Sequence, residues 1–217
     1  MAVTYVNAGA ANATTITIPS GHQGGDLLVM WAFNNGSTTL PTVPTGWTSL
    51  ATGTGTLCAG LIAYRVAGSS SETSGTWTTA THLVCNVYRG QATNKVPLVS
   101  TGQQTGTSTS ISYSGITTMT NPGTSLVAQF SGMSVATDNV SGAPPTSMTN
   151  RADIKASGEV ASFDTNTAVS AYTFNSQSVG ANSGNWISRV VEIRAEQKNI
   201  GRNAGLRPHA FSPGLAR

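Results

Sequence analysis

Charged side chains are scarce in this sequence. They make up 9% of its 217 residues, against about 25% in an average globular protein. Seven basic and seven acidic residues balance one another as far as Arg194, and the net charge of +3 comes from the segment that follows. A nucleic-acid-binding domain gathers Lys and Arg on its folded surface to neutralise phosphates. We therefore expect no nucleic-acid partner.

Long hydrophobic runs and cysteines are scarce as well. No apolar run approaches the roughly 20 residues of a membrane-spanning helix, and the N-terminus has no basic segment followed by an apolar one. We expect no membrane partner, no signal peptide and synthesis in the cytoplasm. Cys58 and Cys85 are too few for a disulfide framework. Two buried, reduced thiols are the preferred prediction, and pairing across the core stays open.

Catalytic and metal-binding patterns are missing too. His22, His82 and His209 stand far apart, without the spacing of metal ligands. The sequence contains neither a nucleophile elbow, G-x-S-x-G, nor a phosphate loop, G-x-x-x-x-G-K. We therefore predict no catalytic residues, no metal site and no cofactor, and hence not an enzyme.

One group of acidic residues invites comparison with a glycosidase. Asp153, Glu159 and Asp164 are close in sequence, but they alternate with Arg151 and Lys155. The two carboxyl groups of a glycosidase must reach the same cleft. We prefer to interpret this region as a solvated hairpin of mixed charge.

What the sequence does contain is a series of short apolar runs between turns rich in Gly, Pro, Asn and Ser. Thr suits a pleated surface, and Gly and Asn accept positive φ. Nine strands at this spacing predict one all-β domain, an antiparallel β-sandwich or jelly roll. The predicted strands are Thr14–Ile18, Leu27–Phe33, Trp47–Ala51, Leu57–Val66, Leu83–Arg89, Ser108–Ser114, Ser125–Phe130, Ala168–Phe174 and Asn185–Arg194.

Hydrophobic periodicity and the positions of proline predict where some of these segments lie in the fold. Leu27–Phe33 is apolar at nearly every position, which predicts a central strand covered on both faces or lying at a subunit interface. Asn185–Arg194 alternates between two faces and is expected to close the fold. Pro41–Gly46 must be a loop, because proline offers no donor to a sheet. Ser134–Arg151 is expected to be a long surface excursion.

The four tryptophans allow two interpretations. Trp31 and Trp186 lie in apolar strands and are expected in the core. Trp47 and Trp77 are either buried with a satisfied N–H group, which we prefer, or exposed platforms for stacking a sugar.

The strand pattern stops after Arg194. We therefore divide the chain into a β-sandwich body, residues 1–196, and an extended basic C-terminal arm, residues 197–217, which cannot bury itself and should order only on a partner. A solvated, unpaired tail is the alternative. The expected partner-binding residues are Lys198, Arg202, Leu206, Arg207, Pro208, Phe211 and Arg217.

Five motifs together resemble a β-rich module of tailed-bacteriophage virion structural proteins. In order they are Gly25–Ala32, Pro44–Leu50, Ala63–Gly68, Gly75–Trp77 and Val87–Gly90. The resemblance implies a virion protein, assembled in the host cytoplasm. Such modules occur in heads and tails alike, so the fold alone does not choose between these locations.

The rest of the chain narrows the expected function. A fibre would need a coiled coil, repeats or further domains for reach, whereas this chain has one compact body and an arm. We expect a capsid decoration (cement) subunit that binds the major capsid protein lattice through the arm. Wide neutral surfaces favour a homo-oligomer, expected to be a trimer. The alternative is a receptor- or carbohydrate-binding tail or fibre module.

Overall fold

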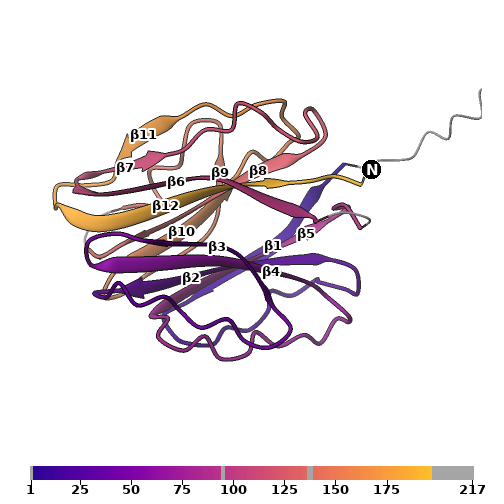
Figure 1. The fold of residues 1–217 in the computed structure, drawn as a ribbon, viewed down its shortest axis with the longest axis horizontal. Helices are drawn as coiled ribbons and strands as arrows, with labels where there is room; N and C mark the ends of the chain where they lie inside the picture. Colours follow the sequence, from indigo (N-terminus) through magenta and orange to yellow (C-terminus); the bar gives the residue numbers. More distant parts are fainter. Residues whose placement is uncertain (1, 94–95, 136–138, 197–217) are drawn as a thin grey trace, which may run out of the picture.

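The regular secondary structure in the described part of the chain consists of β-strands alone. The computed structural model describes residues 2–93, 96–135 and 139–196, and Figure 1 shows two sheets lying face to face. No helix among these residues is long and apolar enough to span a membrane. The predicted all-β class is confirmed, in the form of an antiparallel sandwich.

The first sheet consists of the first five strands along the chain, in the order β1-β5-β2-β4-β3. The central strand β2 is buried at its first eight positions, as predicted for Leu27–Phe33, because layers cover both of its faces. The strands are β1 Thr4–Ala11, β2 Leu27–Asn35, β3 Thr48–Thr54, β4 Cys58–Val66 and β5 His82–Arg89.

The second sheet follows in the chain and has the order β6-β12-β8-β10-β9. A two-stranded sheet of β7 and β11 accompanies it. The bounds are β6 Leu98–Ser108, β7 Ser110–Tyr113, β8 Leu126–Met133, β9 Thr149–Lys155, β10 Glu159–Asp164, β11 Asn175–Ser178 and β12 Gly184–Ile193.

Apolar side chains form three clusters, one between the sheets and one on each outer face. The central cluster contains Trp31, whose ring centroid lies 6.4 Å from that of Phe130 in the other sheet. As predicted, β12 alternates, with Ile187 in this cluster and Trp186 in the outer one. Loops cover the outer face of the first sheet, whereas β7 and β11 lie over that of the second (Figure 1).

The second sheet repeats the first. Strands β1, β5, β2, β4 and β3 correspond in position to β6, β12, β8, β10 and β9. The registers agree, since Leu27 of β2 lies opposite Tyr88 of β5 and Leu126 of β8 lies opposite Ile193 of β12. Even the irregularities agree, because the pairing of β3 with β4 skips Leu50 and that of β9 with β10 skips Arg151.

The turns that lead into β3 and β9 also match. The Trp47 amide donates to the Pro44 carbonyl at 3.2 Å, and the Met148 amide donates to the Pro145 carbonyl at 3.0 Å. The third turn residue has positive φ in both cases. The first turn has Gly46 there, which confirms the predicted loop, whereas the second places Ser147 in this unfavourable region.

Some predicted segments differ from the structure. Residues 14–18 and 168–174 are not strands, although the latter make isolated bridges through Val169 and Tyr172. Strands β1, β6 and β11 were not predicted, and β9 and β10 were expected only as a hairpin. Strands β1 and β6 lie at sheet edges, where few large apolar residues are needed. The predicted surface excursion ends where β9 begins at Thr149, and it buries Val140 and Met148 against the second sheet.

Candidate functional site

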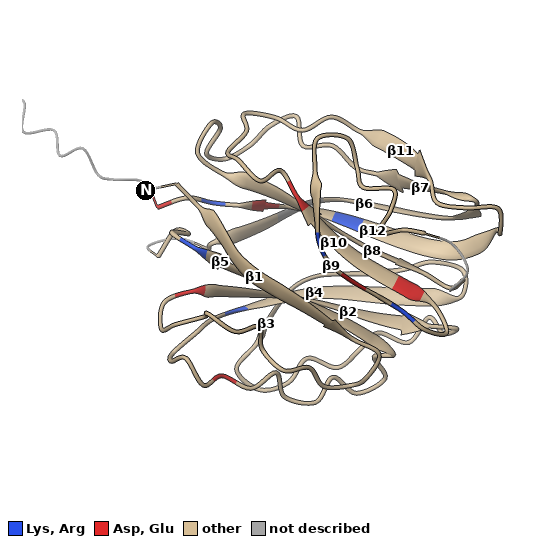
Figure 2. Ribbon diagram, turned by 180° about the vertical axis from the view of Figure 1, so that it is seen from behind, with Lys and Arg blue, Asp and Glu red and all other residues tan. Residues whose placement is uncertain are grey.

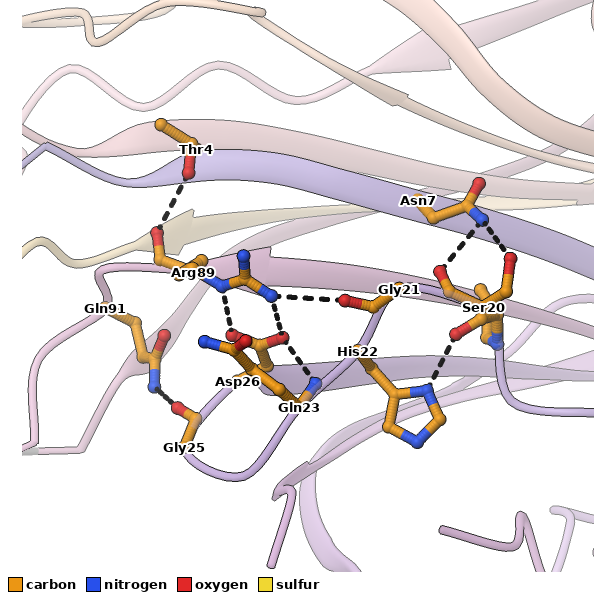
Figure 3. Close-up of polar contacts among 11 residues, drawn as sticks. Thr4, Asn7, Ser20, Gly21, His22, Gln23, Gly25, Asp26, Arg89 and Gln91 are labelled. Atoms are coloured by element: carbon orange, nitrogen blue, oxygen red, sulfur yellow. Dashed lines mark hydrogen bonds and ion pairs between the residues drawn. The ribbon is translucent and has the colours of Figure 1, made fainter. Parts of the chain in front are cut away.

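Two of the sequence motifs meet in one ion pair, which Figure 3 shows. Asp26 lies immediately before β2, and Arg89 is the last residue of β5. The Nε and Nη2 atoms of Arg89 donate to the two carboxylate oxygens of Asp26, both at 2.8 Å. The Asp26 side chain is 2% exposed and that of Arg89 is 42% exposed, so the pair is reached from one side.

Further hydrogen bonds tie this ion pair to the turn before β2. The Gln23 amide donates to Asp26 Oδ2 at 2.9 Å, and Arg89 Nη2 donates to the Gly21 carbonyl at 3.1 Å. The Gln91 side chain donates to the carbonyl of Gly25, which has a φ of 92°. The ion pair therefore fixes the conformation of a tight turn (Figure 3).

Electrostatics keep both members of this pair charged. Burial raises the pKa of Asp26, but hydrogen bonds from Arg89 and Gln23 outweigh this effect and hold the pKa below its usual value. The hydrogen bond to Asp26 raises the pKa of Arg89. The pair therefore keeps its hydrogen-bonding charges, which supports the structure of the turn before β2.

Both ring nitrogens of the nearby His22 are hydrogen-bonded. His22 Nδ1 donates to the Pro19 carbonyl at 2.8 Å, and Nε2 accepts from the Glu72 amide at 3.4 Å. The Glu72 carboxylate pairs with Arg65 and accepts from the Gly68 amide at 2.7 Å. No three His, Cys, Asp or Glu side chains gather as a metal site would require among the described residues.

A second polar cluster connects the two sheets, and we call it the cross-sheet network. Its hydrogen-bonded core begins at Ser162, whose Oγ donates to Asn86 Oδ1 at 2.8 Å. Asn86 Nδ2 donates in turn to the Tyr88 hydroxyl at 3.0 Å. The network consists of Tyr5 of β1, Asn86 and Tyr88 of β5, Arg151 of β9, and Ser162 and Asp164 of β10.

An ion pair completes the cross-sheet network. Arg151 Nη2 donates to Asp164 Oδ1 at 2.6 Å, and its guanidinium carbon lies 4.0 Å from the centroid of the Tyr5 ring. Burial lowers the pKa of Arg151, but Asp164 outweighs that effect and the net shift is upward. Burial, and next the charge of Asp164, raise the pKa of Tyr88 well above its usual value. Asp164 and Tyr88 are 0% exposed, whereas Tyr5 and Arg151 are partly exposed, so only the inner part of the network is shielded from solvent.

The predicted solvated hairpin is therefore wrong in one respect. The hairpin exists as β9 and β10, and Asp153 is exposed, but Glu159 and Asp164 are fully buried. Glu159 accepts from the amides of Val140 and Ser141 at 3.0 and 2.9 Å. The protein interior accepts these two carboxylates because loop amides and an arginine donate hydrogen bonds to them.

Sequence reasoning also missed a third buried acid, Glu192 of β12. Its carboxylate accepts from the amides of Thr120 and Asn121 at 2.8 and 2.9 Å, and from Ser125 Oγ at 2.8 Å. Glu192 shares a face of the strand with Trp186, which packs in the outer cluster. That alternation was the available signal that Glu192 points inward rather than to solvent.

The tryptophans and cysteines belong to the interior. Trp47 and Trp77 are 8% and 0% exposed and stack edge to face at 5.3 Å, so the interpretation as sugar platforms is wrong and burial is confirmed. The predicted satisfied N–H group holds for Trp77, which donates to the Ser74 carbonyl at 3.1 Å, but not for Trp47, whose buried Nε1 has no hydrogen-bond partner within the described residues. The predicted core positions of Trp31 and Trp186 are confirmed. The cysteines are free and buried, as preferred, and burial raises the pKa of Cys58 to about 11.

Three shallow grooves lie on the surface of the described residues. One groove of about 420 Å³ lies between residues 15–18 and 72–76, and another of about 440 Å³ lies between residues 9–11 and 15–17. A third, of about 320 Å³, is lined by Tyr172 and several threonines. Figure 2 shows charged residues scattered along the described ribbon without a basic stripe. These grooves present hydroxyl and peptide groups, which can bind by hydrogen bonds.

All the predicted partner-binding residues lie outside the described residues. They are Lys198, Arg202, Leu206, Arg207, Pro208, Phe211 and Arg217. His209, the third histidine, lies there too. Comparisons of the chain with protein-family models, with curated proteins and with solved structures find no match.

Proposed function

We propose that this protein is a non-catalytic structural subunit of a tailed-bacteriophage virion. In this proposal it is a capsid decoration (cement) protein, a homotrimer that binds the major capsid protein lattice through residues 197–217. The proposal starts from the resemblance of the five motifs. Their residues form one scaffold, in which Asp26 pairs with Arg89 and Trp47 stacks on Trp77.

One observation carries the proposed mode of attachment. Four of the acidic residues, Asp26, Glu159, Asp164 and Glu192, are at most 1% exposed, and their carboxylates bind internal groups. The four bases of residues 197–217 therefore find few carboxylates on the outside of their own body. Acidic groups on another protein would supply the missing partners, and a neutral body would not repel that protein.

The proposed test compares the full chain with a chain truncated after Glu196. Each is incubated with expanded empty capsids of the phage that encodes it, and bound copies are counted after sedimentation and by electron microscopy. We expect the full chain to decorate the shell in a salt-dependent manner, because screening weakens exposed ion pairs. The truncated chain should bind at least tenfold more weakly, while its thermal midpoint changes little. Equal decoration by both chains would show that the arm is not the attachment device.

The receptor- or carbohydrate-binding alternative makes the opposite prediction in the same experiment. Its main candidates for sugar stacking, Trp47 and Trp77, are buried. A protein of that class would bind host cells or a glycan array and leave empty capsids undecorated. Either result decides between the two proposals.

A further inference from the structure

The repeat between the two sheets breaks at the segment Thr14–Ile18. This segment follows β1 as β7 follows β6, and both alternate hydroxyl and large apolar residues, Thr15-Ile16-Thr17-Ile18 against Ser110-Ile111-Ser112-Tyr113. One hydrogen bond is common to both. The Trp77 amide donates to the Thr14 carbonyl at 2.8 Å, and the Val179 amide donates to the Thr109 carbonyl at 3.0 Å.

Beyond that hydrogen bond the two regions differ. In the second half β7 pairs with β11 over four residues, from Ser110 opposite Ser178 to Tyr113 opposite Asn175. Figure 1 shows the two arrows side by side on the outer side of the second sheet. In the first half the corresponding loop, residues 72–76, is not a strand. The first half thus has the acceptor segment without its partner strand.

The backbone of the acceptor segment is open as a result. The Ile16 amide donates to Ser74 Oγ at 3.0 Å. The Ile16 carbonyl, on the edge that faces residues 72–76, makes no hydrogen bond within the described residues. The peptide groups of Thr15 and Thr17 make none there either, but in an extended segment they face the opposite edge. Thr15 and Thr17 are exposed, and no Lys, Arg or Pro interrupts residues 14–18. Proteins commonly protect an exposed strand edge with such residues, and this segment lacks them.

A groove with neutral walls runs beside this open edge. It measures about 420 Å³ and separates residues 15–18 from residues 72–76. This lies within the roughly 300–1,000 Å³ of typical ligand clefts. The Glu72 carboxylate at its border is paired with Arg65 and carries no unbalanced charge. A charged ligand would therefore find no counter-charge here.

We propose that Thr14–Ile18 is the acceptor edge for an extended segment of a partner protein, which adds to it as an antiparallel strand. The incoming segment is uncharged and carries small hydroxyl and amide side chains, as Asn175-Ser176-Gln177-Ser178 does at the corresponding position. Backbone hydrogen bonds to the open edge supply the affinity, and the neutral groove selects against charged segments. This site is separate from the arm and does not depend on the proposed virion role.

The test uses the full chain, labelled with ¹⁵N, and a synthetic peptide of the sequence Thr173–Val179. We expect the peptide to shift the backbone amide resonances of residues 14–18 and 73–77. In β11 the amides of Asn175 and Gln177 lie on the same edge as that of Val179, which bonds to Thr109. A peptide N-methylated at these two positions should bind about tenfold more weakly, since it loses two hydrogen bonds. A peptide methylated at Ser176 and Ser178 is the matched control and should keep its affinity.

A pair of chain variants gives an independent readout. Thr15→Lys with Thr17→Lys places two charges on the acceptor edge and should abolish the shifts. Thr117→Lys with Thr118→Lys adds the same charges to another exposed loop and should leave them unchanged. No shift at millimolar peptide, shifts confined to residues 110–113, or equal binding of both methylated peptides would overturn the proposal. So would binding that occurs only after truncation at Glu196, because the occupant would then be the chain's own arm.

Discussion

The two sheets place different chemistry at corresponding positions where their edges meet. On the polar flank β1 packs near β9, and the positions between the sheets hold the cross-sheet network. On the apolar flank β6 packs near β3, and apolar side chains occupy the positions that correspond to the network. Arg189 of β12 also crosses this flank, donating to the Thr52 carbonyl of β3 and to Gln103 of β6. The residues of the apolar flank are Leu50, Ile62, Tyr64, Leu98, Val191 and Ile193.

The strand registers establish this correspondence. Asp164 lies opposite Ala128 of β8, and Tyr64 lies opposite Val29 of β2, which holds the same place in the first sheet. Arg151 is the residue skipped in the pairing of β9, as Leu50 is in the pairing of β3. The backbone therefore accepts either the Arg151–Asp164 ion pair or Leu50 and Tyr64 at the same positions.

The comparison teaches that the network is not needed to hold two such sheets together. A buried ion pair often contributes less net stability than apolar side chains of similar volume. It does, however, penalise any arrangement in which one partner is buried alone. Because the two sheets have similar shapes, we infer that Arg151 and Asp164 favour the native pairing over the pairing of two like sheets.

The largest expected effect comes from removing one partner of the ion pair. Asp164→Ala leaves the Arg151 guanidinium, 11% exposed in its side chain, without its carboxylate. We expect the free energy of unfolding to fall by about 3–5 kcal/mol, as measured by urea denaturation. A loss below about 1 kcal/mol would mean that the polar flank is already solvated.

Transplanting the apolar flank onto the polar one sharpens the comparison. The double variant Arg151→Leu with Asp164→Tyr introduces the residues that stand at the corresponding positions, Leu50 and Tyr64. We expect it to be as stable as the natural chain or more stable by about 1–4 kcal/mol, by the same denaturation experiment. If the double variant loses as much as Asp164→Ala alone, the two flanks are not equivalent in packing.

Alkaline pH should weaken the polar flank. The folded state raises the pKa of Tyr88 well above 10, so the neutral hydroxyl contributes stability that is fully present below pH 10. That contribution is lost as the pH rises further, because the unfolded state then releases the proton first. The slope should be up to about 1.4 kcal/mol per pH unit from this group. We expect Tyr88→Phe to reduce the slope of unfolding free energy against pH above 10. An unchanged slope would assign the alkaline sensitivity to other groups, such as Cys58.

The smallest effect concerns the matching turns. Ser147 has a φ of 62°, whereas Gly46 has a φ of 88° at the corresponding position. A side chain in this region costs roughly 1–2 kcal/mol, part of which the greater unfolded-state entropy of glycine offsets. Ser147→Gly should therefore stabilise the protein by about 0.5–1 kcal/mol, and Gly46→Ser should destabilise it by a similar amount. Thermal unfolding can measure both, and equal signs for the two variants would contradict the equivalence of the turns.

Much of the fold could be predicted from local sequence patterns. The continuous apolar run in β2 and the alternation in β12 identified a central strand and a closing strand. The repeat could not be predicted, because corresponding residues such as Asp164 and Tyr64 share no chemistry. The buried acids escaped notice for another reason. The alternation of β12 indicates that Glu192 points inward, but its hydrogen-bond donors Thr120, Asn121 and Ser125 are remote in sequence, so no local pattern identifies them.

The order of the strands along the chain has a consequence for synthesis. The first sheet is complete once residue 89 has been added, whereas the second needs residue 193. At about 5–20 residues per second, the inner face with Trp31 and Phe33 waits roughly 5–20 s for its covering layer. During that interval a growing chain presents large aromatic rings to its neighbours. Slow translation of the second half would lengthen this exposure and increase the demand for chaperones on the ribosome.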